Sequence, residues 1–123
     1  MLWVHVDEVE GIKLPGRVWK RLISPEHGPS KNMVLGVVVF PPGSDPGIHS
    51  HEGEEEIIYV LSGRGEIKVG DKVMPLEPGV AVFTEPGLEH GVRNSGEVEL
   101  ILISVFSPPV IPGSYDRRRE SAK

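Results

Sequence analysis

The chain has 123 residues, enough for one domain of ordinary size. It contains no Cys, which excludes disulfides, thiolate nucleophiles and Cys-based metal sites, and its formal net charge of −5 does not favour binding to nucleic acid or an anionic membrane. The N-terminus lacks the pattern of a signal peptide, and no segment approaches the ~20 apolar residues that span a bilayer, so we expect a cytoplasmic protein. The absence of Gln and the presence of 12 Pro indicate a thermophilic source.

Short apolar runs separated by turn residues predict an all-β chain. Hydrophobic residues make up 38% of the chain and aromatic residues only 6%, so the core must consist mainly of Val, Ile and Leu. The predicted strands cover residues 2–6, 18–23, 33–40, 56–61, 66–69, 72–76, 80–84, 90–94 and 98–106. The strands 56–61 and 66–69 flank a short Gly-rich segment, which we interpret as a hairpin turn. Strands at intervals of 8–12 residues predict an antiparallel sandwich or barrel.

Three histidines and one glutamate stand at positions typical of a metal site. His49 and His51 are two residues apart, so in an extended segment both imidazoles lie on one face. Glu56 opens the next predicted strand, and His90 stands at a later junction between a turn and a strand. Imidazole nitrogens combined with a carboxylate oxygen form a site for a divalent transition metal.

The spacing around these residues is more specific than the residues themselves. Five residues separate Gly43 from His49, four separate His51 from Glu56, and six separate Glu56 from Gly63. The second segment contains Gly79, Gly87, His90 and Asn94, with intervals of seven, two and three residues. Together the two segments resemble the two motifs of the cupin family. This resemblance implies a double-stranded β-helix (jelly-roll) barrel and a metal bound by His49, His51, Glu56 and His90.

Several neighbouring residues have alternative interpretations. Glu85 replaces the first Pro usual in the second cupin motif, and it is either a solvated turn residue or a polar group of the pocket. Glu56 is preferred to Glu55 as the ligand because it keeps the spacing to Gly63. Strand alternation places Arg93 on the face opposite His90, and we expect Asn94 to secure the turn that follows. Arg117–Arg119 is interpreted as a solvated tail rather than a phosphate site, and His5 and His27 as surface residues.

Four protein ligands on an octahedral ion leave two positions for water, substrate or dioxygen. The ligand types do not select among Mn²⁺, Fe²⁺, Co²⁺, Ni²⁺ and Zn²⁺. Strand parity places Ile58 and Val60 beside Glu56, with either Val37 and Val39 or Val38 and Phe40 also facing inward. No Lys or Arg is in phase with the ligands, which favours a small, partly apolar substrate that chelates the metal through one or two oxygens.

The resemblance leaves the function open among three classes. A metal-dependent enzyme with dioxygenase-like chemistry is the first hypothesis, and a non-redox isomerase, lyase or decarboxylase is the second. The third is a non-catalytic metal- or ligand-binding protein, because fold does not determine function. We expect one domain with N-terminal strands and loops (1–32), the cupin barrel (33–107) and a C-terminal surface tail (108–123). We also expect a homodimer, formed by the addition of N-terminal strands to the sheet of a second copy.

Overall fold

The computed structural model describes residues 1–28 and 30–110, and the regular structure in these residues is almost entirely β. The only helix among them is one 3₁₀ turn, Val6–Glu8. Accordingly, no helix in the described residues is long and apolar enough to cross a membrane. The strands are β1 (Ile12–Leu14), β2 (Arg17–Ile23), β3 (Val34–Phe40), β4 (Glu55–Ser62), β5 (Gly65–Val69), β6 (Lys72–Leu76), β7 (Ala81–Thr84), β8 (Gly91–Arg93) and β9 (Leu100–Ser107).

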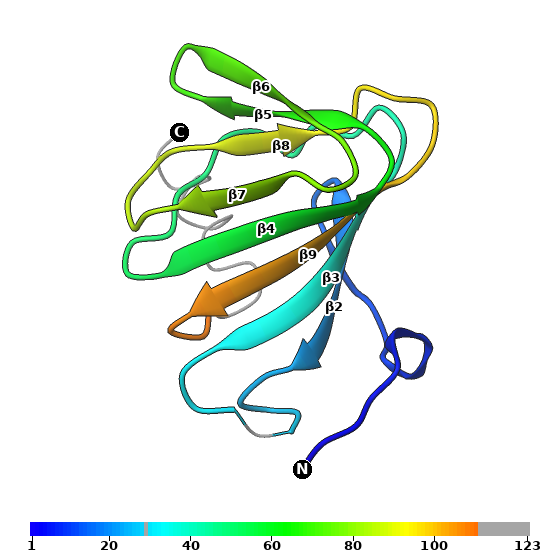
Figure 1. Ribbon diagram of the computed structural model, residues 1–123, viewed down its shortest axis with the longest axis vertical. Helices are drawn as coiled ribbons and strands as arrows, with labels where there is room; N and C mark the ends of the chain where they lie inside the picture. The colour runs from blue at the N-terminus through cyan, green and yellow to red at the C-terminus, as the bar shows by residue number, and fades with distance from the viewer. Residues whose placement is uncertain (29, 111–123) are drawn as a thin grey trace.

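The strands form two antiparallel sheets. The large sheet has six strands in the order β1-β2-β3-β9-β4-β7, and the small sheet has three in the order β6-β5-β8 (Figure 1). Neighbours in the large sheet come from distant parts of the chain, since β9 lies between β3 and β4. This is the predicted jelly-roll architecture. The N-terminal strands extend the sheet of their own chain, since β2 pairs with β3 and β1 pairs with β2.

Alternation along the strands builds a core between the two sheets. In β9 every second residue is buried, and β4 shows the same alternation from Glu56 to Val60. The larger of two buried clusters draws side chains from both sheets. Its fully buried members are Phe40, Ile58, Val60, Ile67, Leu76, Val92, Leu100 and Leu102. A smaller cluster beneath β2 contains Trp19, Val34, Phe106 and Val110. The core therefore consists mainly of aliphatic side chains, as the composition predicts.

Eight of the nine predicted strands are confirmed, with small shifts at their ends, and one is wrong. Residues 2–6 are not a strand, because the side chain of His5 accepts a hydrogen bond from the backbone amide of Asp7 and the chain turns into the 3₁₀ helix. The short strand Ile12–Leu14 was not predicted; its pairing with β2 is a tertiary interaction that a three-residue pattern does not reveal.

The predicted hairpin between 56–61 and 66–69 is also wrong. β4 pairs with β7 and β9, whereas β5 pairs with β6 and β8, so the Gly-rich segment carries the chain from the large sheet to the small one. Gly63 has a φ of 84° and lies directly against the backbone of Glu99 and Leu100. A side chain at position 63 would clash with that backbone, so this crossing point requires glycine.

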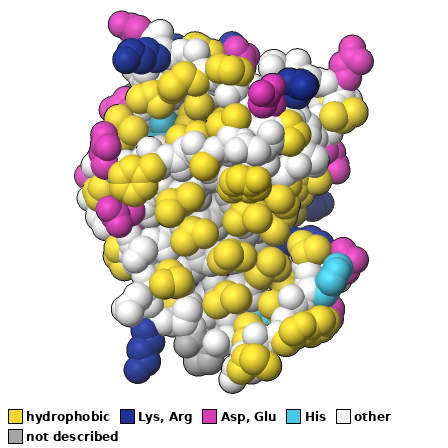
Figure 2. Space-filling model, in the orientation of Figure 1, with side chains coloured by type: hydrophobic (Ala, Val, Ile, Leu, Met, Phe, Trp, Pro, Cys, Tyr) yellow, Lys and Arg dark blue, Asp and Glu magenta, His cyan; other side chains and the backbone are white. Residues whose placement is uncertain are grey.

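The outer surface of the large sheet is apolar. Figure 2 shows hydrophobic side chains gathered over the region in which Figure 1 places β4, β9 and β3. We use the name outer face for a set of apolar residues on β4, β7 and β9. They are Ile57, Tyr59, Leu61, Phe83, Ile101, Ile103 and Val105. The β4 and β7 members are between 43% and 53% exposed. A contiguous apolar face of this kind is typical of an interaction surface.

The tail predicted for 108–123 lies outside the described residues from position 111 onward. The Arg117–Arg119 cluster is part of that segment.

Candidate metal centre

The histidine pair lies on the connection between β3 and β4, residues 41–54. This connection runs alongside β8 and is joined to it at both ends. Gly43 donates to the carbonyl of Asn94, and the amide of Asn94 donates to Ser44, at 3.0 and 2.8 Å. His49 and His90 form an isolated antiparallel bridge, with two N···O distances of 2.8 and 2.9 Å. Backbone pairing therefore places two histidines, 41 residues apart in the chain, opposite each other.

Glycines make this close approach possible. The backbone of Gly91 lies so close to the connection that a Cβ there would be 2.8 Å from the carbonyl oxygen of Gly47 and 2.9 Å from the Ile48 side chain. Gly87, whose φ is 82°, donates its amide to the carbonyl of His51 at 2.7 Å. The Pro-Gly turn before His90 thus fixes the backbone of His51.

The three imidazoles converge. One ligand nitrogen from each of His49, His51 and His90 lies within 4.8 Å of the other two. His51 and His90 are 2% and 1% exposed, and His49 is half-buried. The ring centroid of His49 lies 4.9 Å from that of His51 and 4.6 Å from that of His90. The His49 and His51 imidazoles therefore reach one point, as predicted, and His90 lies beside them.

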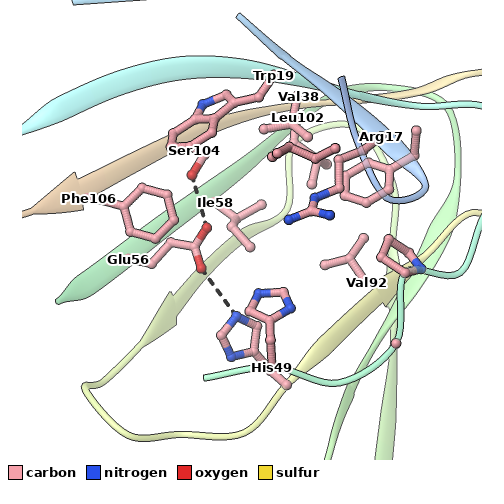
Figure 3. Close-up of a pocket in the computed structure, with 15 residues that line it drawn as sticks. Arg17, Trp19, Val38, His49, Glu56, Ile58, Val92, Leu102, Ser104 and Phe106 are labelled. Carbon is pink, nitrogen blue, oxygen red and sulfur yellow. Dashed lines mark hydrogen bonds and ion pairs between the residues drawn. The ribbon is translucent and has the colours of Figure 1, made fainter. Parts of the chain in front are cut away.

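The carboxylate of Glu56 completes the cluster from the large sheet. Glu56 faces inward from β4, and its Oε1 lies 3.3 Å from His51 Nε2 and 3.2 Å from His90 Nε2. Its other oxygen accepts a hydrogen bond of 2.9 Å from the hydroxyl of Ser104 on β9 (Figure 3). The neighbouring Glu55 is exposed. All four predicted ligands are therefore together, and Ser104 is a contact of Glu56 that the sequence analysis missed.

Burial, hydrogen bonds and neighbouring charges together shift the pKa values of this cluster. His90 Nδ1 donates to the carbonyl of Leu88 at 2.9 Å, which turns Nε2 toward the cluster. Burial works to lower the pKa of His90, but the hydrogen bond and charge of Glu56 raise the pKa above its ordinary value. Burial also opposes ionisation of Glu56, yet its hydrogen bonds to His51 and His90 hold the pKa of the carboxyl well below the usual range. Burial lowers the pKa of His49 to about 2, with the charges of His90 and His51 acting in the same direction.

The donor set fits a divalent transition metal. Neutral imidazole is a common ligand of Zn²⁺, Fe²⁺, Ni²⁺ and Cu²⁺, and a carboxylate suits the harder ions of the series. Two ligand atoms on opposite sides of an ion, each about 2.1 Å from it, are about 4.2 Å apart. Neighbouring ligand atoms on the same ion are closer, about 3 Å apart. The imidazole nitrogens lie within 4.8 Å of one another, so side-chain rotations would bring them to these spacings. His49, His51, Glu56 and His90 are thus the residues that would hold the ion.

A cavity opens beside the cluster, between the two sheets. Its apolar wall includes both Val38 and Phe40, which decides between the two inward-facing pairs expected from strand parity. The other apolar side chains around it include Leu14, Trp19, Ile58, Val92, Leu102 and Phe106. Such a wall keeps bulk water away from a reacting group.

The prediction that no cation lines the pocket is wrong. Arg17 on β2 is 6% exposed and lines the same cavity as His49, Glu56 and His90. The strand predicted here began at residue 18, whereas β2 begins at Arg17, so the parity argument stopped one residue short. Because Arg17 has the same parity as the buried Trp19, a strand drawn one residue longer would have identified it.

The remaining sequence assignments are settled by burial and contacts. Glu85 is exposed and is not among the cavity residues, in agreement with the solvated turn. Arg93 is exposed and forms a 2.9 Å ion pair with Glu66. Asn94 is buried and donates to the carbonyls of Phe40 and Val98, so it secures the end of β8 as predicted. His5 and His27 are exposed.

Comparison with known proteins extends these observations. A family model described as a cupin domain matches residues 36–106, which include all four clustered side chains. The chain belongs to the cupin family. This match covers more than half of the chain and agrees with the two motifs read from the sequence.

A curated protein and a crystal structure from Thermotoga maritima are similar to this cupin. A protein named oxalate-binding protein is 37% identical over 85 residues, which is 69% of this chain and 70% of the relative. A crystal structure described as that of a predicted oxalate decarboxylase has 29% identity and a TM-score of 0.78, and the match covers 88% of this chain and 100% of that one. The ectoine synthase of P. lautus has a TM-score of 0.80 at 22% identity over 98% of this chain and 86% of its own, which supports the fold alone.

Proposed function

We propose that this cupin binds one divalent transition metal through His49, His51, Glu56 and His90 and converts a small molecule that chelates the ion. The observation that carries the proposal is the convergence of three imidazoles and one carboxylate at the edge of a cavity. A bound ion would supply Lewis-acid or redox chemistry at two coordination positions that the protein leaves open.

The cavity favours a small substrate. Its volume is about 40 Å³, and a site for one water needs roughly 10–15 Å³ on this measure, so the free space is about that of three waters. The apolar wall would exclude bulk water, and the Glu56 carboxylate would turn its Oε1 toward the imidazoles while Ser104 holds Oε2. A compact molecule with one or two metal-binding oxygens fits this space.

Oxidative, dioxygenase-like conversion is our first candidate reaction, because an octahedral ion held by four side chains could take one oxygen of a substrate and O₂ at its two remaining positions. A non-redox reaction such as decarboxylation is the second candidate, supported by the likeness to the Thermotoga maritima structure described as a predicted oxalate decarboxylase. The name of the oxalate-binding relative supports oxalate as the first compound to assay, and it also fits a protein that binds without turnover.

The test begins with elemental analysis of protein purified without added metal and then loaded with Mn²⁺ or Fe²⁺. We expect one ion per chain in the wild type and none in His51→Ala, with the β-sheet circular dichroism preserved in both. Glu55→Ala, which changes an exposed neighbour of Glu56, is the matched control and should keep its metal. Equal metal content in wild type and His51→Ala would contradict the proposal.

Loaded protein is then assayed with oxalate and a panel of small oxygen chelators. O₂ uptake that depends on substrate supports the oxidative reaction, and release of CO₂ without O₂ uptake supports decarboxylation. Tight binding without any turnover across the panel would contradict the enzymatic proposal and support the binding protein.

A further inference from the structure

A buried hydroxyl stands beside the metal site without a hydrogen-bond partner. Thr84 is the last residue of β7 and is 1% exposed. Its Oγ1 is fully buried and forms no hydrogen bond with any residue that the structure describes. Burying a hydroxyl without a partner is unfavourable, and most buried polar groups in proteins are hydrogen-bonded. This hydroxyl therefore needs a partner that another state of the site supplies.

Thr84 faces the same interior as Glu56. The two residues stand directly opposite each other in the pairing of β7 with β4, and both side chains are buried. Residues opposite each other on one face of an antiparallel pair have Cβ atoms about 5 Å apart. A rotation about the Cα–Cβ bond of Thr84 can thus bring its hydroxyl within hydrogen-bonding reach of the Glu56 carboxylate. Thr84 is not among the residues that line the cavity, so a substrate in the cavity is a poorer candidate for its partner.

Glu56 lies between two strands that each place a hydroxyl beside it. In the large sheet, β4 is flanked by β9 on one side and by β7 on the other. On the β9 side, Ser104 donates to Glu56 Oε2 at 2.9 Å. Oε1 lies 3.3 Å from His51 Nε2 and 3.2 Å from His90 Nε2. In Figure 3 the two dashed contacts leave the carboxylate in opposite directions, one toward Ser104 and one toward the histidines. Oε1 is therefore turned away from β9.

Metal binding would remove the present partners of Oε1. An imidazole nitrogen binds an ion through its lone pair and carries no proton, so Nε2 of His51 and of His90 cannot donate to Glu56 in the loaded protein. A carboxylate oxygen has two acceptor positions, of which one would face the ion. Oε1 then has a second acceptor position to fill, and Thr84 offers a buried donor from the adjacent strand.

We propose that the Thr84 hydroxyl donates to Oε1 of Glu56 in the metal-loaded protein, so that Ser104 holds the carboxylate from β9 and Thr84 holds it from β7. This inference rests on the proposed function, because Thr84 gains its partner only when an ion is bound. Thr84 is thus a positioning residue, which acts on the ion through Glu56. Partners that orient a metal ligand typically contribute 10–100-fold to metal affinity.

Thr84→Val tests the proposal through two quantities that should change differently. Val has nearly the shape of Thr but no hydroxyl. The metal-free variant loses no hydrogen bond, so its melting temperature should equal or exceed that of the metal-free wild type. The loaded variant lacks the bond to Glu56, so its affinity for Mn²⁺, measured by competition with a chelator, should fall at least about tenfold. A residue with a purely structural role would instead lower the melting temperature of the metal-free protein.

Thr84→Ser is the matched control, because it keeps the hydroxyl and removes the methyl group. It should bind Mn²⁺ with close to wild-type affinity. A further measurement needs no variant to fold. In crystals of the Mn²⁺-loaded wild type, Thr84 Oγ1 should lie about 2.8 Å from Oε1 of Glu56.

The outcomes separate the two proposals. Failure of the wild type to hold Mn²⁺ would contradict the proposed function, and this inference with it. If the wild type holds Mn²⁺, an unchanged affinity in Thr84→Val would overturn only the role of Thr84. A fall in the melting temperature of the metal-free variant would overturn it too, since the hydroxyl would then have a partner before the ion binds. So would a loaded structure in which Oγ1 bonds to a group other than Glu56.

Discussion

Glu56 links the histidine cluster to the large sheet. One oxygen of its carboxylate faces two imidazoles and the other accepts from Ser104, so both oxygens are fixed. Partners that orient a ligand typically contribute 10–100-fold to metal affinity. We therefore expect Ser104 to be a positioning residue, which acts on the metal site through its hydrogen bond to Glu56.

Substitution Ser104→Ala tests this role. Removing the hydroxyl frees one carboxylate oxygen, and we expect metal affinity, measured by competition with a chelator, to fall at least about tenfold. Ser107→Ala, at the end of the same strand, removes a hydroxyl that donates to the backbone of Asn32 and should keep wild-type affinity. Equal affinities in wild type and Ser104→Ala would refute the assignment.

The pKa values of His49 and His90 predict how acid changes the stability of the metal-free protein. Folded His49 stays neutral because its pKa is lowered to about 2, whereas the unfolded chain protonates it near 6.5. The unfolded state thus binds more protons below pH 6.5, and this histidine's contribution to stability falls as the pH drops. The raised pKa of His90 acts in the opposite direction, since its protonated form stabilises metal-free protein at low pH and loses that effect as the pH rises through the raised pKa.

Metal binding requires neutral imidazoles, so acid competes with the ion for all three. We expect the loaded protein to melt at a higher temperature than the metal-free protein at pH 7 and the two melting temperatures to converge at about pH 5, with release of metal. Differential scanning fluorimetry and elemental analysis at the two pH values provide the measurement. A difference that stays constant between pH 7 and pH 5 would contradict this prediction.

At the scale of elements, the connection 41–54 behaves as an additional edge of the small sheet. It is joined to β8 at both ends, and Gly91 allows its backbone to approach at His49. The relative position of His49 and His90 therefore depends on backbone packing rather than on the two side chains.

Substitution Gly91→Ala should separate these elements. The new Cβ would stand 2.8 Å from the carbonyl oxygen of Gly47, so the connection must shift away from β8. We expect weaker metal binding, by about tenfold or more, together with a lower melting temperature. Gly53→Ala adds a Cβ into open space on the same connection and should change neither quantity. Wild-type metal affinity in Gly91→Ala would show that the connection tolerates displacement.

The sequence predicted which side chains cluster better than it predicted their surroundings, and the reasons are physical. The resemblance to the two cupin motifs implied His49, His51, Glu56 and His90, because the motifs fix these residues relative to turn glycines. Ser104 could not, because one hydroxyl on an apolar strand has no pattern of its own. Arg17 was lost to a one-residue error in a strand boundary. The false hairpin at Gly63 arose because a short Gly-rich turn has the same local sequence whether its strands pair or cross between sheets.

At the scale of the whole molecule, the outer face of the large sheet is unusual for a surface in contact with water. Cross-strand neighbours such as Ile57 and Phe83, or Tyr59 and Ile103, place apolar side chains beside one another. A stable interface buries about 800 Å² on each partner. The width of this face, across β4, β7 and β9, leads us to expect that a second copy covers it, as an alternative to the dimer route by N-terminal strands considered from the sequence.

Light scattering coupled to size-exclusion chromatography tests this expectation. We expect the wild type to have the mass of a dimer at micromolar concentration and Tyr59→Lys, in the middle of the outer face, to have that of a monomer. Val73→Lys places the same charge at a 47% exposed position on the small sheet and should remain dimeric. A monomeric wild type, or a dimeric Tyr59→Lys, would exclude this interface.

The central claim is that one ion binds to four side chains contributed by the connection 41–54, β4 and the residue that precedes β8. Crystallography of Mn²⁺-loaded protein, with anomalous difference maps from data collected on both sides of the manganese absorption edge, tests it most directly. The account predicts one peak per chain within about 2.3 Å of nitrogens of His49, His51 and His90 and an oxygen of Glu56. A peak elsewhere on the molecule, or one that His90 or Glu56 does not contact, would contradict it.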